Sequence, residues 1–294
     1  MKKKIVSLLL CLCFVLGAAV PALADVEAGQ ARAVIGANLN DEQIAQVYGM
    51  FGIERGSVRE LTVTNAEERE YLDGLVDSSV IGTNSISCIY VEILPDGQGL
   101  QIETQNLTWC TQEMFINALV TAGIDDAKII VAAPFQVSGT AALTGIYKAY
   151  EDISGQQLDE VAKLVSTQEL VITGELADEI GSYDATMIVN EIKLILDETK
   201  QMTDEQIKAE IRAIAEEYDI TLKDSQLDQL VTLCRALEKM NADELREKVE
   251  YVQNTIKRLA SAQEKVSGIT ATVKNIVSSI GEFIDKIIAF FKGN

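Results

Sequence analysis

The stretch AKIIVAA at residues 127–133 is the part of the sequence that says most about the fold. It is short and almost wholly apolar, which is typical of a central strand that is covered on both faces. Pro134 follows directly, and we expect it to end the strand because proline cannot donate a hydrogen bond to a sheet. Helices are expected on either side, at residues 111–122 and from a Ser138 cap to about Ile153. A sheet with helices packed on it is therefore predicted.

Three further strands are predicted upstream, at residues 58–63, 85–94 and 100–105. The second is rich in β-branched and aromatic residues, and the third alternates apolar and polar residues as a half-buried strand does. The turn sequence PDGQG at residues 95–99 lies between them, so we expect them to pair as a hairpin. Residues 25–150 are therefore predicted to form an α/β sandwich with a roughly four-stranded sheet.

Two helices are expected before the hairpin, and each begins at a residue that can act as a cap. Asn40 is followed by Gln43 at the third position of a capping box. Asn65 precedes a run with Glu67 and Glu68 in its first turn, where the helix dipole favours negative charge. Both helices belong to the predicted α/β sandwich.

Residues 151–294 carry no strand pattern and are predicted to be wholly helical. A helix start is expected at the capping box TDEQ of residues 203–206. Further starts are expected at Ser154, Thr167, Ser182, Asp224 and Asn241. The predicted fold class is α+β, with an α/β domain at residues 25–150 and an all-α domain of long amphipathic helices at residues 151–294.

A heptad pattern marks the end of the chain. Alternate steps of four and three residues from Leu245 to Phe291 pass through fourteen positions, of which twelve are apolar. The pattern is typical of a coiled-coil seam or of a surface helix with one buried face, so self-association through residues 245–291 is one expectation. Gly268 lies between the two polar positions, Gln263 and Thr270, and predicts a break near it.

The segment 268–294 has a wider apolar face, aromatic residues near its end and a mildly positive charge within an acidic protein. Two interpretations stand for this face. In the first, the face binds an unknown protein partner or a membrane surface. In the second, it packs on the other C-terminal helices. The residues of the face are Ile276, Ile280, Phe283, Ile284, Ile287, Phe290 and Phe291.

Residues 1–24 have the pattern of a signal peptide. Three lysines precede an apolar stretch of 15 residues, and ALA at residues 22–24 is a small-x-small cleavage site. The alternative is a retained transmembrane helix, but the apolar stretch is shorter than the ~20 residues that such a helix needs. We expect cleavage between Ala24 and Asp25, followed by an extracellular or cell-envelope location.

The composition excludes several kinds of chemistry. The chain of 294 residues has a formal charge of −20 and contains no histidine. Without imidazole there is no Ser-His-Asp or Cys-His pair and no His-ligated zinc or haem. The negative charge would repel nucleic acid, so a nucleic-acid partner is not expected. The sequence assigns no catalytic residue, no metal ligand and no cofactor.

Three cysteines remain after the signal peptide: Cys88, Cys110 and Cys234. Cys88 and Cys110 lie in neighbouring predicted elements of one domain and could form a disulfide in an exported protein. Three buried, unbridged thiols are the alternative interpretation. The separation of the Cα atoms decides between the two, and a sequence does not give it.

A non-enzymatic binding or interaction protein is the function that the sequence favours. The alternative is a hydrolase that uses two carboxylates on an envelope glycan, but no spacing among the 45 acidic residues places two of them in one cleft. Ser138, Gly139 and Thr140 follow a predicted strand and could offer N–H groups to an anion. An ordinary helix cap is the simpler interpretation, because no phosphate-loop lysine accompanies them.

Several stretches of the sequence resemble a known family. They are TVTNAEEREYL at residues 62–72, IGTNSIS at 81–87, LTW at 107–109, NALVTAGI at 117–124 and VAAPFQVSGTAALTG at 131–145. Together they are similar to the YpuA-like family of secreted proteins of unknown function from Gram-positive bacteria, most densely between residues 60 and 150. The resemblance implies export and a Gram-positive envelope. It implies no activity, because the family has no established catalytic residues.

Overall fold

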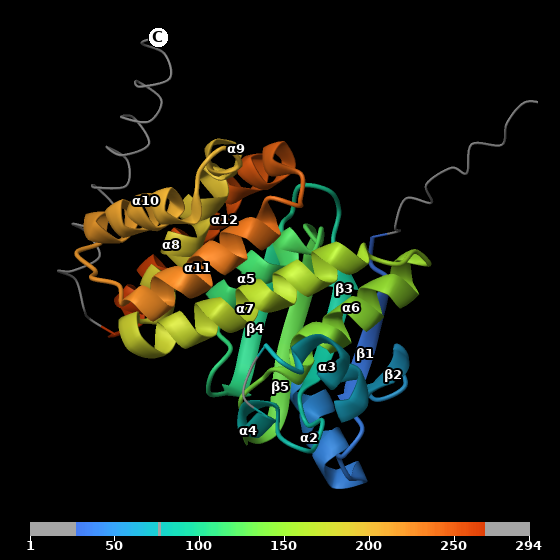
Figure 1. Ribbon diagram of the computed structural model, residues 1–294. Coiled ribbons are helices and arrows are strands. Elements are labelled where there is room, and N and C mark those ends of the chain that lie inside the picture. Colours follow the sequence, from blue (N-terminus) through green and yellow to red (C-terminus); the bar gives the residue numbers. More distant parts are fainter. Residues whose placement is uncertain (1–27, 76–77, 268–294) are drawn as a thin grey trace, which may run out of the picture.

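A five-stranded sheet forms the centre of the computed structural model, which describes residues 28–75 and 78–267 (Figure 1). The strands are β1 (Ala31–Gly36), β2 (Arg59–Val63), β3 (Cys88–Ile93), β4 (Leu100–Leu107) and β5 (Ala127–Val137). Their order across the sheet is β2-β1-β3-β5-β4. The fold is α+β, as the sequence predicts, although the sheet has one strand more than expected.

Helices cover both faces of this sheet (Figure 1). α2 (Asp41–Phe51) lies on one face, and α5 (Gln112–Thr121) and α6 (Ala141–Ser154) lie on the other. α3 (Asn65–Leu72) packs against α6, and the single turn α4 (Ser78–Ile81) follows α3 in the chain. The sheet is thus sandwiched between helices, as its apolar strands require.

Strand β5 contains the AKIIVAA stretch and is buried on both faces. Ile129 packs in the cluster on the side of α5 and α6, whereas Ile130 packs in the separate cluster on the side of α2. β5 pairs antiparallel with β3, with Val131 opposite Ile89, and parallel with β4. The prediction of an interior strand at this stretch is confirmed.

Pro134 does not end β5, contrary to expectation. The ladder between β4 and β5 shifts its register after Gln105, so that Leu107 lies opposite Val137. Within this irregularity, Asn106 adopts a left-handed backbone conformation with φ of 61°, and its Nδ2 donates to the carbonyl of Ala133 at 2.7 Å. A bulge of this kind lets a strand continue past a proline.

The predicted hairpin is wrong, because β5 is inserted between β3 and β4. The loop between these two strands crosses the start of β5, where Asp126 binds both of its ends. Leu94 N–H donates to the Asp126 carbonyl at 3.1 Å, and Gly99 N–H donates to Asp126 Oδ1 at 2.5 Å.

β1 is the strand that the sequence did not reveal. It is six residues long and carries Arg32 among its apolar residues.

Capping residues explain where the first helices begin. The capping box at Asn40 is present, with Gln43 N–H donating to Asn40 Oδ1 at 2.9 Å. α3 begins one residue earlier than expected, because Thr64 is its cap and Asn65 is its first residue. Glu67 completes the box by accepting the Thr64 N–H at 2.8 Å.

Every regular element of the described chain beyond α6 is a helix, as predicted. The helices are α7 (Glu160–Ile180), α8 (Ser182–Leu194), α9 (Leu196–Thr199), α10 (Asp204–Glu217), α11 (Asp224–Leu237) and α12 (Ala242–Ser267). Thr203 caps α10 through the predicted box. Ser154 and Thr167 start no helix, because Asp159 caps α7 and Thr167 lies inside it.

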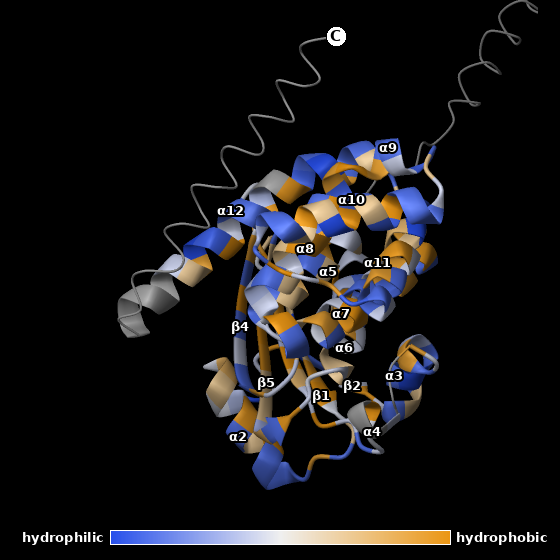
Figure 2. Ribbon diagram, turned by 60° about the vertical axis from the view of Figure 1, so that its left-hand side comes forward, coloured by the Kyte–Doolittle hydropathy of each residue, from blue (hydrophilic) through white to orange (hydrophobic). Residues whose placement is uncertain are grey.

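The main apolar core continues across residue 150. One cluster contains Phe115 of α5 and Ile129 of β5 together with Met187 of α8 and Val252 and Ile256 of α12. Figure 2 shows this apolar zone running from the strands into the helical layer. The division into two domains at residue 150 stays a prediction, and the two parts share a core.

The described half of the heptad stripe packs inside the chain. Leu245, Val249, Val252 and Ile256 are each at most 4% exposed, so their side chains are buried in the chain's own core.

The predicted partner face within residues 268–294 and the predicted cleavage site at Ala24 lie outside the described residues. Across residues 28–75 and 78–267, no helix has both the length and the apolar character that crossing a bilayer requires.

Candidate functional site

A cavity of about 320 Å³ lies between α3, the segment of residues 81–87 and the end of β5. Its polar lining consists of Glu68, Thr83, Asn84, Ser87, Ser138 and Thr140. Its apolar lining consists of Ile81, Ile86, Val137 and Ala141. The lining comes from the stretches 62–72, 81–87 and 131–145, which carry part of the family resemblance. The fold brings these three separated stretches together around one hollow.

Glu68 is the charged group of the cavity wall. Its side chain has no exposed surface, because α3 turns it toward α6 on the same helix face as the buried Leu72. Thr140 Oγ1 donates to Glu68 Oε1 at 2.6 Å, and Asn65 Nδ2 donates to Glu68 Oε2 at 3.3 Å. Burial raises the pKa of Glu68, although these two hydrogen bonds and the nearby charge of Arg69 oppose the change.

Thr140 is the N-cap of α6, so the expectation that Ser138 caps this helix is wrong. Its hydroxyl does not cap the helix but turns to Glu68, and Ser138 Oγ lies 3.3 Å from Thr140 Oγ1. The carbonyl of Ser138 accepts the Cys110 N–H at 3.0 Å, which fixes the loop before α6. The positive end of the α6 dipole is thus met by a carboxylate of the protein itself.

Arg69 fixes the outer wall of the cavity. Its Nη2 donates to the carbonyl of Gly82 at 2.6 Å and its Nε donates to Asn65 Oδ1 at 3.0 Å. Its Nη1 also pairs with Asp73 at 2.8 Å. The guanidinium therefore ties the start of the 81–87 segment to α3.

Lys148 of α6 fixes α3 from the opposite side. Its Nζ donates to Glu67 Oε1 at 2.5 Å and to the carbonyl of Thr62 at 2.6 Å. Burial alone would raise the pKa of Glu67, but hydrogen bonds from Lys148 and Thr64 hold it below its ordinary value. Two adjacent glutamates of one helix thus have opposite electrostatic surroundings, since Glu67 is bonded to a cation and Glu68 is bonded to neutral donors.

Cys88 and Cys110 are free, buried thiols in this structure and are not joined. Cys88 packs in the cluster on the α2 side of the sheet, and Cys110 packs in the cluster on the α5 and α6 side. Cys234 is also free and buried. Burial raises the pKa of all three thiols. The interpretation as buried, unbridged thiols describes this arrangement.

The wall of the cavity does not contain a pair of acids. Among the described residues that line it, Glu68 supplies a carboxylate and no second Asp or Glu takes part. Glycosidases of the common kind use two carboxyl groups about 5–9.5 Å apart. In the described ranges, no group of three or more His, Cys, Asp or Glu side chains is placed to hold a metal ion.

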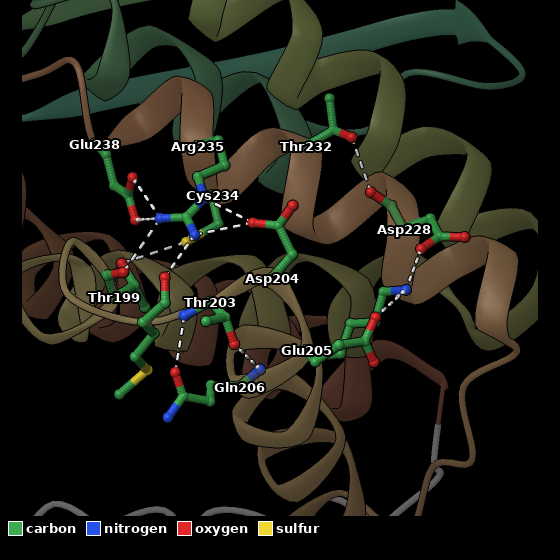
Figure 3. A network of polar contacts seen from close by, with 12 residues as sticks. Thr199, Thr203, Asp204, Glu205, Gln206, Asp228, Thr232, Cys234, Arg235 and Glu238 are labelled. Atoms are coloured by element: carbon green, nitrogen blue, oxygen red, sulfur yellow. Dashed lines mark hydrogen bonds and ion pairs between the residues drawn. The ribbon is translucent and has the colours of Figure 1, made fainter.

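A second polar centre surrounds Arg235 of α11 (Figure 3). Its guanidinium donates to the carbonyls of Thr199 at 3.2 Å and Met202 at 2.7 Å, and to the carboxylates of Asp204 and Glu238. The guanidinium thus contacts the last residue of α9, the turn after α9, the first residue of α10 and the residue that follows α11. This centre joins the ends of three helices.

A third polar centre lies inside the core between α5, α7 and α8. Lys193 and Glu169 form an ion pair at 2.7 Å, and each side chain is 1% exposed. Thr121 Oγ1 donates to Glu169 Oε2 at 2.6 Å, and Lys193 Nζ donates to the Asn117 carbonyl at 3.3 Å. Burial raises the pKa of Glu169 and lowers the pKa of Lys193. The pair has no access to solvent and fixes how the helices meet.

Glu68 was not among the site residues expected from the sequence. A signal for it exists, because Glu68 precedes Leu72 by four residues and therefore shares the face of α3 that packs on α6. An acidic residue on the apolar side of a short helix is unusual and indicates a specific partner. Ser138 was singled out, and it does lie in the cavity, although not as a cap.

A known protein resembles the chain over most of its length. The chain is 38% identical over 271 residues to "Uncharacterized protein YpuA" of Bacillus subtilis (strain 168), which covers 92% of this chain and 88% of that protein. No solved structure matches the chain. Residues 35–259, which include all the lining of the cavity, match the family described as "Protein of unknown function (DUF1002)". The resemblance seen in the sequence is confirmed, and the chain belongs to the DUF1002 family.

Proposed function

We propose that the protein is an exported, non-enzymatic binding protein that holds a small polar ligand in the cavity beside Glu68. One observation carries this proposal: three separated stretches of sequence meet around a hollow that has a fully buried carboxylate in its wall. Burial of a charged group costs free energy, so a fold that keeps one beside a hollow is typical of a binding site. Pockets of this kind combine an apolar lining with a few placed polar groups.

The surroundings of the cavity favour a preformed site. Arg69 binds the segment of residues 81–87 to α3, and Lys148 binds α3 to α6. Both cations use carbonyl and carboxylate oxygens as partners, so the three elements are held from two sides. A ligand would then bind without a large ordering cost.

Export is supported by the leader alone. The basic start, the apolar stretch and the small-x-small motif before Asp25 have the order that signal peptidases recognise. A location at the cell envelope would place the cavity in contact with small molecules outside the cytosol. The 268–294 face stays a predicted partner or membrane surface.

Blocking the mouth of the cavity tests the binding proposal. Thr83 is exposed and lies in the lining, so Thr83→Trp would fill the hollow from outside without disturbing the core. Thr221→Trp is the matched control, because Thr221 is exposed in the loop between α10 and α11. A library of small polar compounds would be screened by ligand-observed NMR against the wild type and both variants.

The proposal predicts compounds that bind the wild type and the Thr221→Trp variant but not the Thr83→Trp variant. Binding that persists in all three proteins would place the ligand elsewhere. A screen without any binder, with all three proteins folded, would contradict a small-molecule site in this cavity.

A further inference from the structure

We infer that the ligand of the Glu68 cavity carries a protonated amine, an inference that rests on the function proposed above. Its basis is a buried carboxylate that lacks a counter-ion. Glu67 pairs with Lys148 and Arg69 pairs with Asp73, but within the part of the chain that the structure describes no Lys or Arg forms an ion pair with Glu68. Buried carboxylates are ordinarily paired or protonated.

The hydrogen bonds of Glu68 leave its charge largely uncompensated. Thr140 and Asn65 each donate one hydrogen bond, and both donors are neutral. Arg69 attracts the carboxylate only from a distance, since its own donors are used on Asn65, Gly82 and Asp73. A carboxylate offers about four lone-pair sites, so further acceptor capacity remains. The positive charge that these neutral donors lack must come from a proton or from a cation.

The carboxylate acts on the cavity across a single hydroxyl group. Glu68 has no exposed surface and Thr140 is 2% exposed, and both residues line the hollow. The Thr140 hydroxyl is the direct partner of Glu68 Oε1. A cation in the hollow would therefore lie one hydroxyl away from the negative charge, a distance at which attraction is strong in a partly buried site.

The rest of the lining can accept hydrogen bonds from an ammonium group and, among its described residues, offers no cationic side chain to an anion. No lysine or arginine is among the described residues of the lining, and the positive end of α6 already faces Glu68. Thr83, Asn84 and Ser87 bring oxygen atoms that can accept hydrogen bonds. An ammonium group has three hydrogen-bond donors, which match these acceptor oxygens. Its positive charge meets no lysine or arginine in the described lining. The volume of about 320 Å³ restricts the ligand to a small amine.

The test compares pairs of compounds that differ only by an amine in place of a hydroxyl group. The probes are ethanolamine with ethylene glycol, putrescine with 1,4-butanediol, and trans-4-aminocyclohexanol with trans-1,4-cyclohexanediol. Affinities are measured by calorimetry and NMR titration for the full exported protein, for Glu68→Gln and for Glu70→Gln. The second variant is the matched control, since Glu70 is an exposed acid of the same helix and does not line the cavity.

We expect the wild type to prefer at least one amine over its hydroxyl partner by about tenfold or more. Glu68→Gln should lose this preference, because it keeps the shape of the side chain and removes its charge, whereas Glu70→Gln should retain it. Wild-type affinity for the amine should also fall from pH 8 toward pH 4.5, where Glu68 gains a proton and the amine stays charged. If Glu68→Gln does not fold, the pH series decides the matter by comparison with the hydroxyl partner compound, whose affinity should not change over the same range.

Different outcomes separate the two proposals. A hydroxyl compound that binds as well as its amine partner, and that is blocked by Thr83→Trp, would overturn the amine inference and leave the binding function standing. Amine binding that is independent of pH and of Glu68 would also overturn the inference. Failure of every probe to bind at millimolar concentration, together with an empty library screen, would overturn both.

Discussion

The indole ring of Trp109 lies against the backbone of Gly174, so closely that a Cβ atom at position 174 would overlap Cζ2 of the ring. One turn further along α7, Asp178 Oδ2 accepts a hydrogen bond from Trp109 Nε1 at 3.1 Å. Trp109 lies between β4 and α5, and therefore this contact joins the sheet to the helical layer. Because the chain has a single tryptophan, its fluorescence reports on this junction.

Gly174→Ala should destabilise the protein by about 1–3 kcal/mol, because the new methyl group displaces the indole ring and its bond to Asp178. Unfolding in urea measures the loss, and a red-shifted tryptophan emission would show that the ring has moved. Gly49→Ala is the control. Gly49 is exposed in α2, and a Cβ atom there would meet nothing within 4 Å, so alanine should stabilise the helix. Equal stability of the two variants would contradict the contact.

Glu191 should make the protein less stable as the pH rises. It is 2% exposed on α8 and accepts hydrogen bonds from Gln253 Nε2 at 2.9 Å and Tyr218 Oη at 3.4 Å. Burial raises the pKa of Glu191 to about 7, while Lys257 opposes and Glu217 adds to the change. Between pH 4.5 and 7 the folded state therefore holds more protons than the unfolded state, and stability is lost as pH rises through that window.

Glu191→Gln should remove this loss, which amounts to about 3 kcal/mol for a change of this size. Since the chain has no histidine, few other groups titrate between about pH 6 and 8. The free energy of unfolding is measured at pH 5, 6, 7 and 8 for the wild type, Glu191→Gln and the exposed control Glu216→Gln. A wild-type curve parallel to that of Glu191→Gln would show that Glu191 does not titrate in this range.

Lys193→Met should cost about 3–5 kcal/mol, because it leaves the Glu169 carboxylate buried without its cation. The double variant Lys193→Met with Glu169→Leu should be more stable than the single variant, since no charge is then left unpaired. Thermal and chemical denaturation of the wild type, the two single variants and the double variant gives the coupling energy between Lys193 and Glu169. Additive effects of the two substitutions would indicate that the ion pair does not form.

Arg235→Lys should lower the melting temperature almost as much as Arg235→Gln. Lysine keeps the charge but cannot donate at once to the Thr199 and Met202 carbonyls and to Asp204, as the planar guanidinium does (Figure 3). Differential scanning calorimetry measures the change. Recovery of wild-type stability by lysine would mean that charge alone matters at this position.

The mature protein should begin at Asp25, because the residues before it have the pattern of a cleaved leader. Intact mass and N-terminal sequencing of protein collected outside the cytosol would show the loss of residues 1–24. Replacing Ala22 and Ala24 by bulky residues should block processing. Retention of Met1 in the exported form would exclude cleavage.

Local patterns in the sequence predicted those elements whose causes are local. The AKIIVAA run predicted β5, and the boxes at Asn40 and Thr203 predicted the starts of α2 and α10. The helical character of the second part also followed from its lack of a strand pattern and from its recurring capping residues. In each case the decisive residues lie within one element, where spacing and capping chemistry act.

Features that depend on distant partners were missed. The hairpin between β3 and β4 was wrong because β5, which comes later in the chain, pairs with both. Strand β1 is short, and its pairing with β2 and β3 defines it more than its own pattern does. Glu68 was missed as a site residue because its environment is formed by Thr140, 72 residues away.

The position of β5 between two earlier strands sets the order in which the sheet can assemble. β3 and β4 leave the ribosome first, and although β3 can pair with the earlier β1, neither strand can pair with β5 until residues 127–137 have been made. Until then each strand has an open hydrogen-bonding edge, which is where unfinished chains aggregate. Synthesis that stops before Val137 would thus yield fragments with unmatched strands, and the nascent chain must be shielded up to that residue. Late closure of this kind would suit the proposed export, in which the polypeptide stays unfolded until it has crossed a membrane.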